Sequence, residues 1–449
     1  MRHYFLLFLL FFIVATGYSQ KQTEEAQSFS LQEAISFALE NNYSAINAER
    51  DIIDAQKQKW ETIAAGLPQI SGSISYQNQL KQPISLIPAE FFGGEPGTFQ
   101  PIVFGQAQQA TASANLKQQI FDGSYIVGVQ ATKAFLSYSS NNREKTQLEV
   151  RKGVTEAYGN VLLAQESVSI FEKNKTNLEK NLFETSKIYE NGLGDEESVE
   201  QLQITLSKVD NQLKNAIRLK SITLQMLNLM MGIAIDSPTK LKDNLDNLAQ
   251  KQIDFTLLES VFSIENNVDY KLATNLNEQR FYELKLAKSR ALPTLNAFIN
   301  YGSSAYSDDF SFLNSDQQWF DSSVWGFDLS IPLFSSLKRS ASTHRAKIAL
   351  EKAKTQLSEA EEQIRLQLEN AKSHYVLAID QYETSKKNLG LAERIEKKNQ
   401  IKYSEGIASS FELRQAQMQL YDAQQGYLQA MVEVINKKVA LETVLNNTP

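Results

Sequence analysis

The spacing of apolar residues along the chain follows two different periods. In four short stretches apolar and small polar residues alternate, as Ile70 and Ile74 do with Ser71 and Ser73. A period of two predicts β-strands that carry one apolar and one polar face. We therefore expect strands over about residues 69–80, 108–121, 294–303 and 323–333.

After each pair of predicted strands, the apolar residues step by three and four, as in the seam of a coiled coil. These stretches cover residues 124–189 and 335–403, and neither contains a proline. At about 1.5 Å per residue, each would reach roughly 100 Å as one helix. Asn191-Gly192 and Glu405-Gly406 follow, and a second stretch with the same spacing comes after each pair. Glycine suits the left-handed residue at a helix end, so each long helix is predicted to fold back as a hairpin.

The plan of helix, strand pair and helical hairpin occurs twice. Leu39-Glu40-Asn41-Asn42 recurs as Ile264-Glu265-Asn266-Asn267, and Tyr189-Glu190-Asn191-Gly192 recurs as Tyr403-Ser404-Glu405-Gly406. The sequence thus has an internal two-fold repeat, with copies at about 30–235 and about 255–446 joined by a connecting segment at about 232–254. The offset between the copies shrinks along the chain, so we expect the first copy to have the longer loop, near residues 83–105.

Composition narrows the classes of function. With 52 acidic and 45 basic residues the net charge is −7, which gives no general reason to bind nucleic acid. The sequence has no cysteine, so thiol nucleophiles, thiolate metal sites and a lipid on an N-terminal cysteine are not expected. The three histidines are scattered. We therefore predict no metal and no cofactor.

The start of the chain has the layout of a secretory signal peptide. Arg2 precedes an apolar run, and small residues follow it up to Ser19. Residues 1–19 are interpreted as this signal and 20–449 as the mature chain. No later apolar stretch approaches the roughly 20 residues of a membrane-spanning helix. The mature chain is therefore either soluble outside the cytoplasm or crosses a membrane as strands.

Aromatic residues favour membrane-crossing strands over a soluble β-sandwich. They stand near the predicted strand ends, where a transmembrane barrel carries interfacial girdles: Tyr76, Phe121, Tyr301, Trp325 and Phe334. Several strands also have the length of about ten residues that crosses a bilayer when tilted. Four strands cannot close a barrel, because at least about eight are needed. Several copies of the chain must then share one barrel, and geometry alone permits two, three or four.

No catalytic motif accompanies this plan. The sequence has no Gly-x-Ser-x-Gly, no phosphate-binding loop and no paired-histidine zinc motif, so it is not predicted to be an enzyme and no catalytic residue is assigned. A passive, water-filled duct is the favoured interpretation. The alternative is a periplasmic coiled-coil scaffold that does not conduct.

The chain resembles the TolC-like outer-membrane efflux family. The resemblance rests on Leu31-Gln32-Glu33-Ala34-Ile35 near the start, on both Leu-Pro pairs before strands, on the duplicated plan and on both hairpin turns. It implies a mainly α protein with a transmembrane β portion. In this fold three copies with four strands each form a homotrimer with a twelve-stranded β-barrel in the outer membrane, and a long α-helical coiled-coil barrel continues it into the periplasm.

The resemblance also implies partners and site residues. The partners are a periplasmic adaptor (membrane fusion) protein and an inner-membrane transporter of a tripartite efflux or type I secretion system, together with outer-membrane lipid. In the family the hairpin turns contact the adaptor; here they are Asn191-Gly192-Leu193 and Glu405-Gly406-Ile407, with Asn and Glu in place of the family's Val. Two acidic positions that constrict the family's pore correspond to Glu412 and Gln415, of which one is acidic here. Three copies of Glu412 around an axis would favour cations.

Overall fold

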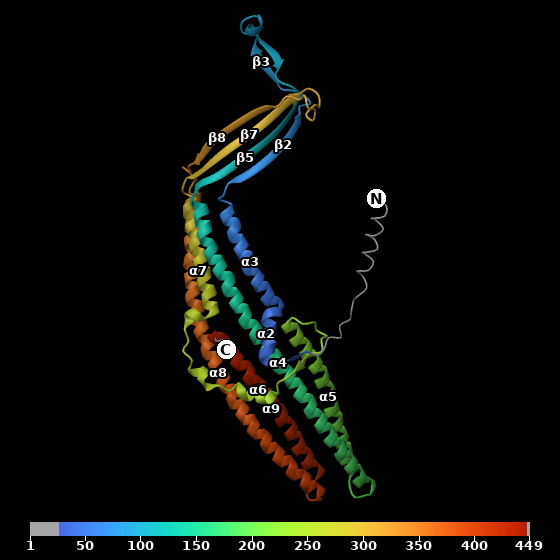
Figure 1. Cartoon of the computed structure of the whole chain (residues 1–449). Coiled ribbons are helices and arrows are strands. Elements are labelled where there is room, and N and C mark those ends of the chain that lie inside the picture. Colours follow the sequence, from blue (N-terminus) through green and yellow to red (C-terminus); the bar gives the residue numbers. More distant parts are fainter. Residues whose placement is uncertain (1–26, 447–449) are drawn as a thin grey trace, which may run out of the picture. The chain divides into compact units, whose positions relative to one another are not determined.

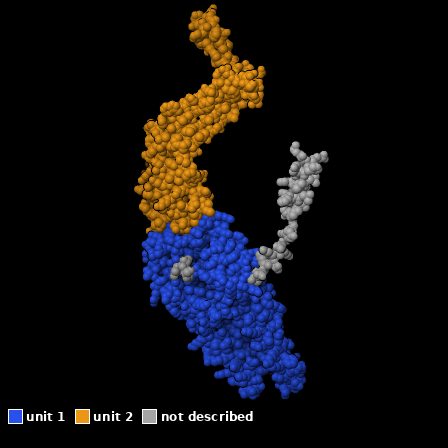
Figure 2. All heavy atoms as spheres, in the orientation of Figure 1, with its two compact units in different colours: residues 1–50, 142–271, 360–449 blue, residues 51–141, 272–359 orange. Residues whose placement is uncertain are grey.

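The computed structural model describes residues 27–446, and most of them are helical (Figure 1). The predicted signal peptide lies outside the described residues. The chain forms two compact units: residues 51–141 and 272–359 make unit 2, and the other described residues make unit 1 (Figure 2). Each unit contains segments from both sequence copies. The repeat therefore does not correspond to two separate domains.

A four-stranded antiparallel sheet is the main β element of unit 2 (Figure 1). Its order is β2-β5-β7-β8, with bounds Gln69–Asn78, Gln108–Asp122, Thr294–Ser307 and Phe320–Ser330. Each copy contributes two neighbouring strands, and the copies meet where β5 pairs with β7. The outer strands β2 and β8 each pair on one side only, so both edges of this sheet are open among residues 27–446.

Strand register separates apolar from polar side chains. Directly paired residues form one apolar row across all four strands: Ile70, Leu116, Ile299 and Trp325. Three positions along the strands, a row on the opposite face consists of Ser73, Ser113, Gly302 and Ser322. On this face the Oγ atoms of Ser73 and Ser113 lie 2.8 Å apart. Because neighbouring residues point to opposite faces, one side of the sheet is mainly apolar and the other mainly polar, although Ser303 and Asp321 lie on the mainly apolar side.

Two strands end at different places from those predicted. β7 continues to Ser307, and β8 begins at Phe320 and ends at Ser330. The added part pairs small and polar residues such as Ser304, where apolar contrast gives little signal. Pro332 lacks an amide donor, which explains why β8 stops before residue 333.

The prediction of four strands is too low, because two short pairs of strands occur in addition to the four-stranded sheet. β3 (Ile84–Pro88) and β4 (Phe99–Val103) form an antiparallel hairpin around the 3₁₀ helix η2 (Ala89–Phe92). This hairpin occupies the stretch predicted as the longer loop. β1 (Ser28–Phe29) pairs in parallel with β6 (Lys240–Leu241) in unit 1.

Two long helices follow the strand pairs. α4 is Gly123–Glu190 and α8 is Lys338–Ser404, and each begins within unit 2 and ends within unit 1. The Asp122 carboxylate accepts a 2.7 Å hydrogen bond from the Ser124 amide at the start of α4. α8 begins three residues later than predicted, because Ser336 and Leu337 have positive φ angles. The return helices are α5 (Glu196–Met231) and α9 (Ser410–Leu445).

The second asparagine of each repeated Asn-Asn pair lies between the end of one helix and the start of the next. These residues are Asn42 and Asn267. The first predicted helix is divided at Asn42 into α2 (Leu31–Asn41) and α3 (Tyr43–Ala64). The Asn42 side chain accepts from the Ser44 amide at 2.8 Å and donates to the Met230 carbonyl at 2.7 Å. Asn267 before α7 (Val268–Ser289) likewise accepts from the next helix and donates to the Val444 carbonyl at 2.9 Å. Both asparagines therefore combine a helix cap with a tertiary contact.

The largest core lies in unit 1, where α2, α4, α5, α8 and α9 pack with the connecting segment. That segment contains α6 (Leu245–Lys251) and is followed by the 3₁₀ helices η3 (Phe255–Glu259) and η4 (Ile264–Asn266). The Tyr375 hydroxyl lies 2.6 Å from the Gln252 carbonyl oxygen and accepts from the Asp254 amide at 2.9 Å. A buried tyrosine of α8 thus holds the segment after α6.

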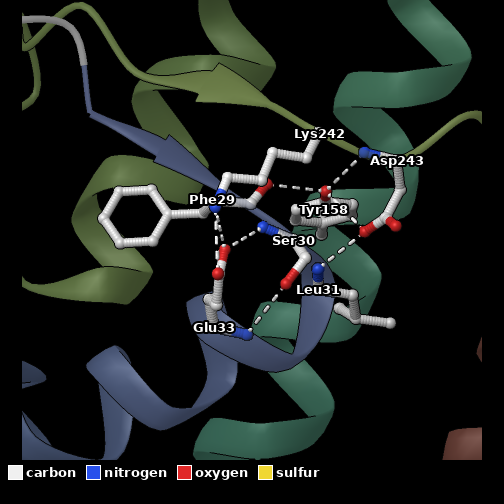
Figure 3. A network of polar contacts seen from close by, with 7 residues as sticks. All are labelled: Phe29, Ser30, Leu31, Glu33, Tyr158, Lys242 and Asp243. Carbon is white, nitrogen blue, oxygen red and sulfur yellow. Dashed lines mark hydrogen bonds and ion pairs between the residues drawn. The ribbon is translucent and has the colours of Figure 1, made fainter.

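A second buried tyrosine holds β1 and β6 (Figure 3). The Tyr158 hydroxyl lies 2.9 Å from the Phe29 carbonyl oxygen and 2.8 Å from the Asp243 carboxylate, which also accepts from the Leu31 amide at 2.7 Å. Glu33 forms a 2.8 Å ion pair with Lys242. These contacts fix the first described residues to α4 and to the connecting segment.

Among the helices of residues 27–446, none combines the length and the hydrophobicity needed to cross a bilayer.

Candidate functional site

The first candidate site is the turn between α4 and α5. Gly192 has a φ of 72°, and the Leu193 amide donates to the Ile188 carbonyl at 3.0 Å, which closes the end of α4. Asp195 caps the start of α5, and its carboxylate accepts a hydrogen bond from the Ser198 amide at 2.7 Å. A glycine-bearing helix end and a capped helix start thus follow each other within a few residues.

The turn between α8 and α9 is built in the same way. Gly406 has a φ of 71°, and the Ile407 amide donates to the Lys402 carbonyl at 2.8 Å. Ser409 caps α9. Both turns lie at the same end of unit 1 (Figure 1). Leu193 is 82% exposed and Ile407 75%, so each turn presents an apolar side chain to solvent.

Glu412 and Gln415 are exposed residues in the first turns of α9. Glu412 forms a capping box with Ser409: its amide donates to the Ser409 Oγ at 3.3 Å, and its carboxylate accepts from the Ser409 amide at 2.8 Å. The hydrogen bonds from Ser409 lower the pKa of the Glu412 carboxyl below its ordinary value. The carboxylate is therefore charged at neutral pH and held close to the turn.

Polar contacts join the two hairpins near their turns, and the seam spacing did not predict them. Ser198 and Ser410 hydroxyls lie 2.6 Å apart, and Thr185 and Tyr403 hydroxyls 2.9 Å apart. Arg414 donates to the Gln201 side chain. The first return helix buries Ser198 and Thr205, whereas the apolar neighbours Val199 and Leu206 are only partly buried. Buried polar residues of this helix also follow steps of three and four. The spacing of the apolar residues alone could therefore not show that these polar residues are buried.

Buried polar groups continue along the same contact. Burial raises the pKa of the Glu396 carboxyl on α8, and a hydrogen bond with Gln417 acts against this shift. Gln417 is buried, and neither its Oε1 nor the Nδ2 of buried Asn181 has a hydrogen-bond partner among the residues that the structure describes. Unpaired buried polar groups cost free energy. The hairpins are therefore held together here less firmly than in the apolar core.

A groove of about 550 Å³ opens between the last turns of α4 and α8. Its lining mixes apolar and charged side chains, among them Phe183, Glu184, Lys187, Ile401 and Leu413. All of them belong to unit 1 and lie close in sequence to the two turns.

Only two of the five predicted girdle aromatics lie near strand ends. Tyr76 and Phe121 lie near the ends of β2 and β5, and the Tyr76 ring packs edge-on against Phe310, with centroids 5.6 Å apart. Tyr301 and Trp325 lie in the middle of β7 and β8, because β7 extends farther than predicted and β8 begins earlier. Phe334 follows Pro332 and lies outside the strands. The strand-end position predicted for Tyr301 and Trp325 is thus wrong, and Phe334 lies four residues beyond the end of β8.

Comparisons with known proteins agree with this architecture. The sequence profile described as "Outer membrane efflux protein" matches residues 34–233 and 263–447. No curated protein matches the chain. Solved structures share its fold at low sequence identity.

Three of these structures show how far the likeness extends. VceC of Vibrio cholerae is 16% identical, with a TM-score of 0.70 over 93% of this chain and 96% of that protein. The Campylobacter jejuni CmeC outer membrane channel is 17% identical, with a TM-score of 0.72 over 96% and 91%. The Neisseria gonorrhoeae MtrE outer membrane channel is 16% identical, with a TM-score of 0.68 over 93% and 88%. Together with the profile match, they confirm the resemblance found in the sequence, and the chain belongs to the outer membrane efflux protein family.

Proposed function

We propose that the chain is one protomer of the outer-membrane exit duct of a tripartite efflux or type I secretion system, and that the duct conducts substrates passively to the outside. The observation that carries this proposal is the sheet of unit 2, which has one polar face, one apolar face and two open edges.

The need to close the sheet into a barrel argues for an assembly of several copies of the chain. Unpaired backbone groups on β2 and β8 would cost several kcal/mol each in lipid, so an open four-stranded sheet is unsuited to a membrane. Three copies supply twelve strands, enough for a barrel with an aqueous interior. The row with Ser73 and Ser113 would then face water, and the row with Ile70 and Leu116 would face lipid.

The hairpins suit the periplasmic end of such a duct. α3 leads into β2 at Gln69, and α4 leaves β5 at Asp122, so the helices attach to one end of the sheet. The exposed Leu193 and Ile407 are then available to a periplasmic adaptor protein. Adaptor contact would shift hairpins that are joined by hydroxyl pairs such as Ser198 with Ser410, and so open the duct. Energy would come from the inner-membrane transporter.

Conductance in a planar bilayer tests this function. The purified protein should give stepwise, water-filled channel currents, whereas a coiled-coil scaffold would give none. Native mass spectrometry of the same sample should show three chains. A folded protein that forms trimers but never conducts would contradict the duct.

Two neighbouring positions of β5 provide a matched control. Ser113→Lys places a charge on the polar face, so channels should form and shift their ion selectivity toward anions. Ala114→Lys places the same charge on the apolar face, where about 2–4 kcal/mol is lost at the bilayer midplane, so far fewer channels should insert. The reverse outcome would mean that the two faces are assigned wrongly.

A further inference from the structure

The β3–β4 hairpin has one face made only of apolar residues. Cross-strand partners on this face are Ile84 with Val103, Leu86 with Pro101, and Pro88 with Phe99. On the opposite face Ser85 pairs with Ile102 and Ile87 with Gln100, so this face mixes polar and apolar residues. Ile84 is 64% exposed, Leu86 66% and Phe99 62%. We call the six residues from Ile84 to Val103 in these pairs the hairpin face.

Such a face needs a partner. A two-stranded ribbon is only marginally stable alone in water, and β3 and β4 pair with no other strand among residues 27–446. Phe91 and Phe92 at the tip of the hairpin are also exposed. Contiguous exposed apolar surface of this kind marks an interaction site.

We propose that the hairpin faces of the three copies pack against one another above the outer mouth of the duct. This inference rests on the proposed function, because it needs the trimer. The hairpin follows β2, an open edge strand, and leaves it at the end away from the helices. Hydrogen bonds from the Gln79 amide to the Ala107 carbonyl (2.8 Å) and from Gln82 to the Gly105 carbonyl (3.2 Å) hold its base together. Closure of the barrel would therefore bring three hairpins to the same end.

Lipid is a poor occupant of the hairpin face. Both outer edges of the ribbon carry unpaired backbone groups, which are costly in hydrocarbon. The anionic headgroups of a membrane surface are attracted by clusters of basic residues, but Lys81 is the only basic residue between β2 and β5. Glu90 and Glu95 are the acidic ones, so three copies carry too little charge to repel one another strongly.

Prolines favour contact through the face rather than through the edge. Pro88 and Pro101 have no amide hydrogen, so they interrupt the donors that a strand from another chain would pair with. Face-to-face packing keeps these edges in water and buries the apolar side chains. Three packed faces would narrow the exit of the duct.

Disulfide cross-linking tests the contact directly, because the chain contains no cysteine. Leu86→Cys lies on the hairpin face, and Ser85→Cys lies on the other side of the same strand. On oxidation of the purified trimer, we expect covalent pairs of chains for Leu86→Cys and at most a small fraction of that yield for Ser85→Cys. Equal yields, or no cross-link at Leu86→Cys in an intact trimer, would overturn the proposal.

Two further readouts separate the causes of failure. Native mass spectrometry of each variant reports whether trimers form. If they do not, both this inference and the proposed duct are wrong, whereas trimers without cross-links contradict only the hairpin contact. A fluorophore on Leu86→Cys should resist quenching by nitroxide lipids in proteoliposomes. Strong quenching would show that lipid covers the hairpin face instead.

Discussion

Glu412 combines a structural contact with the position proposed for a pore charge. Its carboxylate accepts the Ser409 amide of the capping box while remaining exposed. Glutamine can replace glutamate in such a box, so Glu412→Gln removes the charge and keeps the cap. We expect weaker block of single-channel currents by divalent cations in this variant, with α9 still folded.

Gln415 provides the opposite change. Gln415→Glu places a second carboxylate three residues from Glu412 on the same side of α9. Cation block should then be stronger than in the natural protein. If both variants show unchanged block, Glu412 does not line the constriction and serves only as a helix cap.

Glu33 should make the anchoring of β1 dependent on pH. The hydrogen bond from Lys242, helped by the Ser30 amide, lowers the pKa of Glu33 from 4.5 to about 2. A lowered pKa stabilises the folded form above pH 4.5, and this contribution is lost as the pH falls toward about 2. Hydrogen exchange of residues 28–33, corrected for its intrinsic pH dependence, should show less protection at pH 2 than at pH 5.

Glu33→Gln is the control for this pH effect. It keeps an acceptor for the Ser30 amide and removes the charge that pairs with Lys242. Its protection should be lower at pH 5 and should change little down to pH 2. The same pH dependence in both proteins would assign the effect to other groups.

At the scale of elements, the sequence predicted helices and strands well where apolar contrast was strong. The period of two identified β2 and β5, and the steps of three and four identified α4 and α8. The β3–β4 hairpin was predicted only as a loop, because its short strands carry prolines and their apolar residues alternate with few polar ones. The contact between Ser198 and Ser410 depends on tertiary packing that no local pattern contains.

The hairpin turns allow a paired test of glycine. Gly406 has a positive φ and open space around it, so Gly406→Ala should destabilise the turn by about 1 kcal/mol through backbone strain alone. Gly426 lies within α9, also with open space, and Gly426→Ala should stabilise that helix by roughly 0.5–1 kcal/mol. Hydrogen exchange of the α8 end and of α9 measures both. Equal effects of the same sign would contradict the assigned turn geometry.

At the scale of the whole molecule, the four-stranded sheet has two edges that no other described strand covers. The alternation of apolar and polar residues predicted the two faces of the sheet, and the register of β5 with β7 shows that both copies join in one sheet with open edges. The number of chains does not follow from the alternation, because two, three or four chains each supply enough strands. Membership of the outer membrane efflux protein family supports three.

Cross-linking of the open edges measures closure most directly. One variant carries Ser73→Cys on β2 together with a single cysteine on β8, moved stepwise from Ser322 to Phe327. At the correct register, oxidation should link β2 of each chain to β8 of the next and give a ladder that ends at three covalently joined chains. If every β8 position leaves folded, membrane-inserted single chains, the edges do not meet between copies and the shared barrel is wrong.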